Sequence, residues 1–189
     1  MKKILLILLC SMCLPAAAET LDINVGHDSF RGEWSGPLSR LLSGTSGEYD
    51  VGFLSRPEDA RKIFMPHVGL LVTGDAGAPN MGLTAGLGGR VVYVHRRPID
   101  GGSLALGGQL AARFPAANRF GFTAYGYIGP RIISFGEIDG YREYGASLDY
   151  EVIRNGAIYV GYRNINLDFD AVRKVTADTG FHGGLRLTF

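Results

Sequence analysis

The chain has 189 residues, and its 19 Lys and Arg residues nearly balance 18 Asp and Glu residues, which excludes the strongly basic surface of a nucleic-acid-binding domain. Glycine occurs 28 times, together with 9 Tyr and 10 Phe residues. That is roughly twice the usual glycine share of about 7%. Both cysteines lie near the amino-terminus, so no disulfide is expected in the rest of the chain. This composition favours an outer-membrane β-barrel over a soluble secreted enzyme.

The first 18 residues have the three parts of a secretory signal. Lys2 and Lys3 form a positive start, residues 4–14 form an apolar run too short to cross a bilayer as a helix, and residues 16–18 form a small-residue cleavage site. The residues before the two cysteines are Leu and Met, where a lipoprotein would need a small residue. We therefore expect export, cleavage and one non-lipidated domain over residues 19–189.

Apolar and polar residues alternate along the rest of the chain with the two-residue period of a β-strand. Clusters of Gly, Pro, Asn and Asp interrupt this alternation, and Asn155-Gly156 is a strong hairpin signal. The pattern predicts an all-β fold, a transmembrane antiparallel up-and-down barrel of ten strands. Eight strands are the alternative, because the first two segments are weak. The predicted strands are 21–25, 30–36, 49–53, 64–72, 81–94, 103–114, 119–133, 141–153, 157–169 and 178–189.

One face of each predicted strand is apolar and suits lipid, and the other is polar and suits a lumen. In 157–169 the apolar set changes parity, from Ile158, Val160 and Tyr162 to Ile165, Leu167 and Phe169. We interpret the change as a β-bulge near Arg163 that keeps all six side chains facing lipid. An error in the assumed register is the other explanation.

The inward face carries charges of both signs. Side chains fill a barrel of eight to ten strands, and isolated buried charges are very costly, so the inward charges must pair. The sequence thus predicts a polar network that fills the lumen and supports no assigned activity. A narrow anion-preferring channel, in which arginines attract anions, is the alternative. The predicted network consists of Arg90, Gln109, Arg113, Arg131, Glu143, Asp149, Glu151 and Arg186.

The predicted connections differ in length. Bacterial barrels have short periplasmic turns and longer outer loops. Counting back from a periplasmic carboxy-terminus places 154–156, 115–118 and 74–80 in the periplasm, and 170–177, 134–140, 95–102 and 56–61 outside. The exposed Arg96 and Arg97 offer a possible contact to lipopolysaccharide phosphates.

The closing segment 178–189 ends on Phe189, after alternating apolar residues. This ending is similar to the closing strand of bacterial outer-membrane barrels, in which a terminal Phe is read by the barrel assembly machinery. It predicts Phe189 as an assembly signal. The expected partners are that machinery, periplasmic chaperones, outer-membrane lipid and lipopolysaccharide, with no nucleic acid.

Catalytic and metal-binding patterns are weak. His27, Asp28 and Ser29 have the spacing of the His and Ser in lipid A deacylases, but their surroundings do not match, and Ser29 suits a turn. A lipid-modifying enzyme is therefore only the second alternative, and we expect no catalytic residue. The other histidines lack the spacing of a zinc site, so no metal or cofactor is expected.

The carboxy-terminal part of the chain contains the short motifs 86–89 (GLGG), 129–135 (GPRIISF), 141–144 (YREY), 161–163 (GYR) and 184–189 (GLRLTF). In this order they resemble the YfaZ family of small outer-membrane proteins. The resemblance implies an outer-membrane barrel. It brings no established activity and no site residues.

Overall fold

The structure, a computed structural model, describes residues 19–57, 62–78, 81–96, 99–169 and 173–189. The predicted signal peptide therefore lies outside the described residues. The strands are β1 (Thr20–Gly26), β2 (Phe30–Pro37), β3 (Gly47–Arg56), β4 (Ile63–Asp75), β5 (Gly82–Arg96), β6 (Ile99–Arg113), β7 (Phe120–Gly129), β8 (Ser134–Gly136), β9 (Gly140–Ile153), β10 (Gly156–Phe169) and β11 (Arg173–Thr188). Short 3-10 turns η1 (Leu38–Arg40), η3 (Pro115–Ala117) and η4 (Arg131–Ile133) lie between strands.

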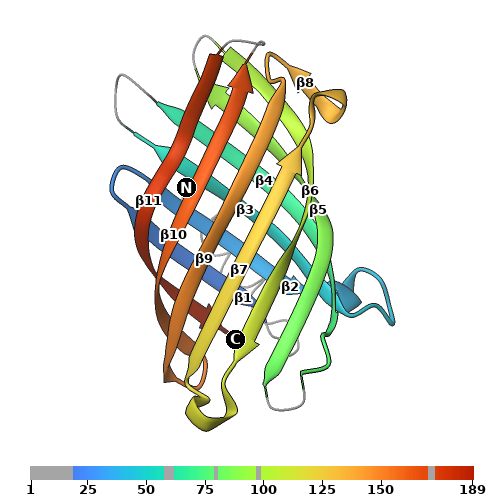
Figure 1. The fold of residues 1–189 in the computed structure, drawn as a ribbon, viewed down its shortest axis with the longest axis vertical. Helices are drawn as coiled ribbons and strands as arrows, with labels where there is room; N and C mark the ends of the chain where they lie inside the picture. Colours follow the sequence, from blue (N-terminus) through green and yellow to red (C-terminus); the bar gives the residue numbers. More distant parts are fainter. Residues whose placement is uncertain (1–18, 58–61, 79–80, 97–98, 170–172) are drawn as a thin grey trace, which may run out of the picture.

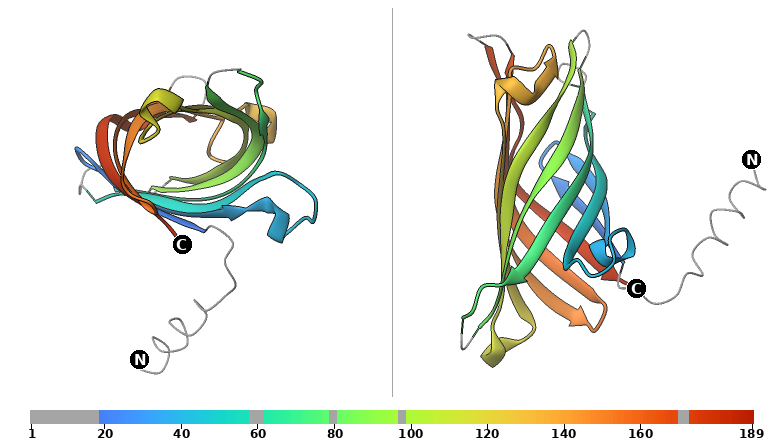
Figure 2. Two further views of the ribbon diagram at one scale, coloured as in Figure 1. Left: turned by 90° about the horizontal axis from the view of Figure 1, so that it is seen from below. Right: turned by 90° about the vertical axis from the view of Figure 1, so that its right-hand side faces the viewer.

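The strands form a closed antiparallel barrel (Figures 1 and 2). Each long strand pairs with its neighbours in the chain, and β1 pairs with β11 to close the ring. The short β8 pairs with β6 beyond the end of β7, so β7 and β8 form one interrupted strand. Pro130 causes the interruption, because it has no N–H to donate to the ladder. When β7 and β8 are counted as one, the described residues form a barrel of ten strands, which confirms the ten-strand prediction.

The outer surface of the barrel is apolar. Leu87, Val160 and Phe181 are 76%, 65% and 80% exposed, and such side chains occur on nearly every strand. Because alternate side chains of a strand point to opposite faces, exposure of this set directs the polar set inward. The apolar-out prediction is confirmed for most strands. Among the described residues no helix is long and apolar enough to span a bilayer.

The apolar end of β10 points inward, against the prediction. Ile165, Leu167 and Phe169 are 2%, 0% and 4% exposed and share the inward face with Arg163. The parity of β10 therefore does not change. The register shift between β10 and β11 leaves Ala177 of β11 without a partner, so the bulge lies on the neighbouring strand. The predicted bulge was wrong because an apolar side chain can face either lipid or an apolar layer inside the barrel.

Three predicted loop boundaries were also wrong. Strands β5 and β6 continue into the predicted loop 95–102, with His95 opposite Asp100. Their side chains pair at 2.6 Å, so the charges support the hairpin instead of ending it. Strand β11 begins at Arg173, within the predicted loop 170–177, and β7 ends at Gly129, before the predicted end at 133.

The first and last described residues, Glu19 and Phe189, lie at one end of the barrel and exchange two backbone hydrogen bonds of 2.9 Å. We call this the terminal end and the opposite one the far end. The connections at the terminal end are 38–46, 76–81, 114–119 and 154–155. Those at the far end are 27–29, 57–62, 97–98, 130–139 and 170–172. The far end does not have the longer connections, so the predicted length difference was wrong.

Candidate functional site

The lumen is crossed by a layer of buried ion pairs. Arg31 of β2 binds Glu143 of β9 at 2.8 Å and Glu33 on its own strand at 2.7 Å. Arg90 of β5 lies 3.4 Å from Glu143 and 3.0 Å from Asp50 of β3. The carboxylate of Glu143 on β9 therefore joins two arginines, on β2 and β5, across the lumen. Such pairing is what permits these charges to leave water.

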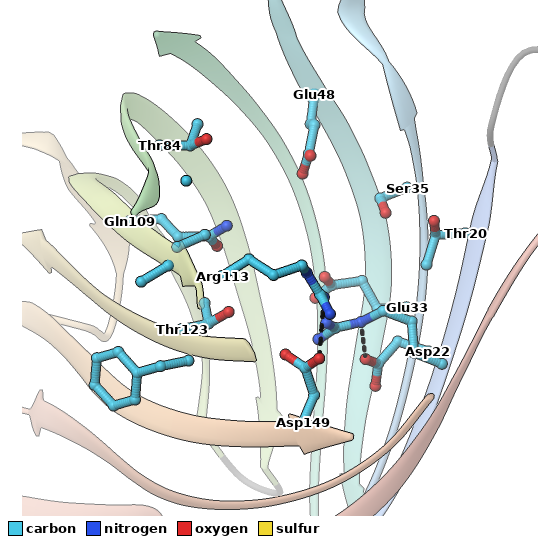
Figure 3. Close-up of a pocket in the computed structure, with 15 residues that line it drawn as sticks. Thr20, Asp22, Glu33, Ser35, Glu48, Thr84, Gln109, Arg113, Thr123 and Asp149 are labelled. Carbon is cyan, nitrogen blue, oxygen red and sulfur yellow. Dashed lines mark hydrogen bonds and ion pairs between the residues drawn. The ribbon is translucent and has the colours of Figure 1, made fainter. Parts of the chain in front are cut away.

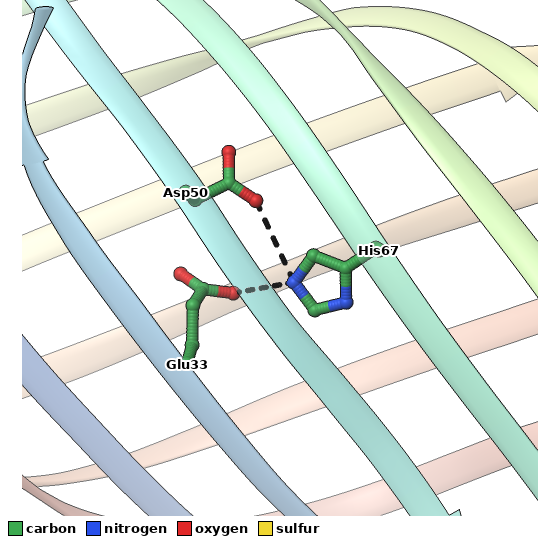
Figure 4. A group of neighbouring side chains, drawn as sticks. All are labelled: Glu33, Asp50 and His67. Carbon is green, nitrogen blue, oxygen red and sulfur yellow. Dashed lines mark hydrogen bonds and ion pairs between the residues drawn. The ribbon is translucent and has the colours of Figure 1, made fainter. Parts of the chain in front are cut away.

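His67 of β4 extends this ion-pair layer (Figure 4). Its Nε2 atom lies 3.1 Å from Glu33 and 3.5 Å from Asp50. Among the described residues, these three are the group that could hold a metal ion. Both carboxylates already contact arginine, however: Glu33 contacts Arg31, and Asp50 contacts Arg90. A divalent cation would have to compete with two fixed positive charges, so the group fits an ion-pair network better than a metal site.

A second polar cluster lies against strands β1, β10 and β11. Arg163 binds Asp178 through Nε and Nη2 at 2.8 and 2.7 Å, and donates to Asn24 at 3.1 Å. Arg163 is among the largest fully buried side chains. Nearby, Tyr159 donates to Asp22, and Arg186 binds the same carboxylate at 3.2 Å. This cluster holds the seam where the first and last strands meet.

An apolar layer covers the ion pairs on the side of the far end. On β5 the buried Val92 and Val94 follow Arg90, and on β10 Ile165 and Leu167 follow Arg163. On β4, Met65 lies one inward position beyond His67. These side chains belong to one packed cluster with Leu54, Ile63, Ala105, Tyr127, Ile138, Tyr141, Phe169 and Ala177. Toward the far end, the lumen thus contains a layer of ion pairs and then a layer of packed hydrocarbon.

A polar cavity occupies the lumen between the ion pairs and the terminal end (Figure 3). Its volume is about 320 Å³, and a smaller space of about 90 Å³ shares part of its wall and reaches the ion-pair layer. We call the two spaces the vestibule. Charged and polar groups on its wall include Asp22, Glu33, Glu48, Thr84, Gln109, Arg113, Thr123, Asp149 and Arg186.

The predicted network residues occupy different levels of the barrel. Arg90 and Glu143 lie in the ion-pair layer, and Gln109 and Arg186 line the vestibule. Arg113 binds Asp149 at 3.1 Å and lies 3.8 Å from Glu151, near the terminal end. Arg131 does not face the lumen. It lies in η4, its side chain is 74% exposed, and it pairs with Asp139 at 3.2 Å. Pro130 turns the chain out of the strand and carries Arg131 with it.

Other lumen residues were absent from the predicted network. Asp22 and Asn24 alternate with the outward Ile23, so strand parity alone could have identified them. Asp178 directly follows Ala177, the unpaired residue of β11, and no pattern in the sequence indicates its contact with Arg163. That contact depends on the closed ring.

The structure does not assemble His27 and Ser29 into a catalytic pair. The His27 side chain is 91% exposed and its Nε2 lies 3.3 Å from Asp28. Ser29 is buried and its hydroxyl accepts from Arg163 at 3.5 Å. Ser29 therefore lacks the histidine contact that would activate it as a nucleophile.

Comparison with known proteins gives one family and several similar solved structures. The model of the family described as YfaZ precursor matches residues 58–189. No curated protein matches the chain. The structure of the NanC porin is similar with a TM-score of 0.45 and 8% identity, over 92% of this chain and 100% of that chain. The outer membrane channel DcaP of Acinetobacter baumannii is similar with a TM-score of 0.41 and 9% identity, over 90% of this chain and 62% of that chain.

The family match covers more than half of the chain and includes every motif on which the sequence resemblance was based. The closed barrel and its apolar outer surface agree with it. The chain therefore belongs to the YfaZ precursor family and is a β-barrel of the bacterial outer membrane.

Proposed function

We propose that the protein is a closed outer-membrane barrel that conducts no solute and holds a polar vestibule with one blind end. The observation that carries this proposal is the double closure, in which a packed apolar layer lies over the ion pairs of Arg31, Arg90 and Glu143. A hydrated ion would have to separate buried pairs and then enter hydrocarbon. Both steps are strongly unfavourable.

A narrow anion-preferring channel has less support. The wall of the larger cavity carries Asp22, Glu33, Glu48 and Asp149 against two arginines, Arg113 and Arg186. An acidic excess at the entrance repels anions. The buried arginines further in are paired with carboxylates, which reduces their attraction for a passing anion.

Electrical recording in planar lipid bilayers tests the closed state. The purified, refolded protein should give no steady single-channel current in 1 M KCl, in a bilayer where a general porin, added afterwards, does conduct. Reproducible unitary currents that scale with the amount of protein would overturn the proposal. Heat-modifiable gel migration of the same sample checks that the inserted protein is folded.

We also place the terminal end, and so the vestibule entrance, in the periplasm. Glu19, where the mature chain is expected to begin, and Phe189 both lie there, and keeping them on the side of entry avoids moving charged termini through the bilayer. The mature chain would contain no cysteine, so single-cysteine labelling gives a direct test. A membrane-impermeant maleimide on intact cells should label Glu137→Cys at the far end and not Ser43→Cys at the terminal end. The reverse result would invert the assignment.

A further inference from the structure

We propose that the vestibule binds a small zwitterionic solute, one that carries an ammonium group and a carboxylate. This proposal goes beyond the closed barrel and rests on its blind vestibule. The cavity of about 320 Å³ lies at the lower end of the range of small-molecule sites, which is roughly 300–1,000 Å³. Its wall is rich in hydroxyl, amide and charged groups, which suits a hydrophilic solute.

Glu48 supplies the anionic half of the site. It lies on the inward face of β3, next to Asp50, and its side chain faces the open cavity (Figure 3). Within the described part of the chain, no ion pair or hydrogen bond engages its carboxylate. The other carboxylates of the wall differ: Asp22 binds Arg186, Glu33 binds Arg31 and Asp149 binds Arg113. Glu48 is therefore the wall carboxylate that has no ion pair or hydrogen bond among the described residues, and the Arg186 guanidinium acts on it only through its charge.

Arg186 supplies the cationic half. Its Nε donates to Asp22 at 3.2 Å, and its guanidinium lies over the Tyr159 ring at 5.3 Å. These two contacts hold the guanidinium in place. Its two terminal nitrogens have no acceptor among the residues that the structure describes. A planar pair of N–H donors at the end of an arginine matches a carboxylate in bidentate geometry.

The two groups face the cavity from different walls. Glu48 is on β3 and Arg186 is on β11, and β1 and β2 separate them in the ring. A solute that satisfies both must carry its opposite charges at two separate positions. Thr84, Gln109 and Thr123 offer neutral donors and acceptors along the remaining wall. A solute with only one charge would engage either Glu48 or the terminal nitrogens of Arg186, but not both.

Isothermal titration calorimetry on the refolded barrel in detergent micelles tests this inference. The probes are the ω-amino acids from glycine to 6-aminohexanoate. Each is compared with two analogues that carry a single charge, such as butylammonium and butyrate for 4-aminobutyrate. At least one ω-amino acid should bind saturably, at least tenfold more tightly than either of its analogues. Absence of saturable binding throughout the series, or equal binding of a monopolar analogue, would overturn the inference.

Three variants connect binding to the two groups. Glu48→Gln should weaken binding of the preferred probe at least tenfold, and so should Arg186→Gln. Glu151→Gln removes the same charge near the terminal end, outside the cavity wall, and should bind like the wild type. Because Arg186→Gln also leaves Asp22 without its cation, that variant could misfold, and Glu48→Gln then decides the result alone.

The outcome is separable from that of the conductance test. If the protein conducts and still binds the zwitterion, the closed-barrel proposal is wrong and the binding proposal holds. If it neither conducts nor binds, the closed-barrel proposal holds and the binding proposal is wrong. Unchanged binding in folded Glu48→Gln would exclude the assigned site.

Discussion

Arg31 and Glu143 are 112 residues apart in the sequence, and their side chains meet inside the barrel at 2.8 Å. Both side chains are almost fully buried, with exposed fractions of 8% and 2%. Glu143 also binds Arg90 and accepts a hydrogen bond from Tyr141, so one carboxylate joins the ion-pair layer to the apolar layer above it. Removing the charge of Glu143 should therefore destabilise both the ion-pair layer and the apolar layer.

We predict that Glu143→Gln lowers the free energy of unfolding by about 3–5 kcal/mol, because it leaves two buried arginines with fewer anions. Unfolding by guanidinium chloride in lipid vesicles, followed by the fluorescence of the single tryptophan, Trp34, measures the change. Glu151→Gln is the matched control. Its side chain is 37% exposed, so its loss should cost about 0–1 kcal/mol. Equal effects of the two variants would contradict the central role of Glu143.

The apolar layer gives a second prediction. Leu167 is 0% exposed and packed inside the barrel, so Leu167→Ala should cost about 2–5 kcal/mol through lost burial and a residual cavity. Leu42, in the connection between β2 and β3, is 54% exposed, and Leu42→Ala should stay within about 0.5 kcal/mol of the wild type. The same unfolding measurement compares them. A neutral Leu167→Ala would show that Leu167 faces lipid, as the sequence had suggested.

A third prediction concerns a close approach of two strands. A Cβ atom on Gly69 of β4 would collide with the carboxylate of Asp50, whereas a Cβ on Gly74 of the same strand would meet nothing within 4 Å. Gly69→Ala should therefore push Asp50 away from Arg90 and destabilise the barrel by about 1–3 kcal/mol. Gly74→Ala should leave stability unchanged or slightly improved. Similar midpoints of unfolding for the two variants would disprove this account of Gly69.

The role of Phe189 as an assembly signal remains a prediction. In the folded barrel its ring packs edge-on against Trp34, with centroids 5.2 Å apart. Deletion of Phe189 should reduce the heat-modifiable, membrane-inserted fraction in cells and leave export and signal cleavage intact. Phe189→Tyr keeps the aromatic ring and should assemble normally. Normal heat-modifiability of the deletion variant would refute the proposed signal.

The sequence alone predicted the fold class, the strand number and the family. A strand places alternate residues on opposite faces, so the alternation of Leu83, Ala85 and Leu87 with other residues is enough to identify a strand with one apolar face. Arg90 and Glu143 were placed inward for the same reason. The face on which a side chain lies is a local property of its strand, and it can be predicted without knowing which strands lie opposite each other across the lumen.

The loop boundaries were less predictable. His95 and Asp100 looked like a charged loop, but they pair across an extended hairpin. Arg131 had the parity of an inward residue, but Pro130 ends the ladder before it. The first prediction was wrong because pairing between the two strands extends the hairpin, and the second because Pro130 lacks the N–H group that would continue the ladder.

Only the tertiary structure decided what the lumen contains. Ile165, Leu167 and Phe169 point inward because the parity of β10 is unbroken, and period-two alternation cannot distinguish an apolar residue facing lipid from one in a buried layer. The contacts of Arg31 with Glu143 and of Arg163 with Asp178 depend on how ring closure staggers the strands. Alternation determined which charges must find partners, and the closed ring determined which partners they found.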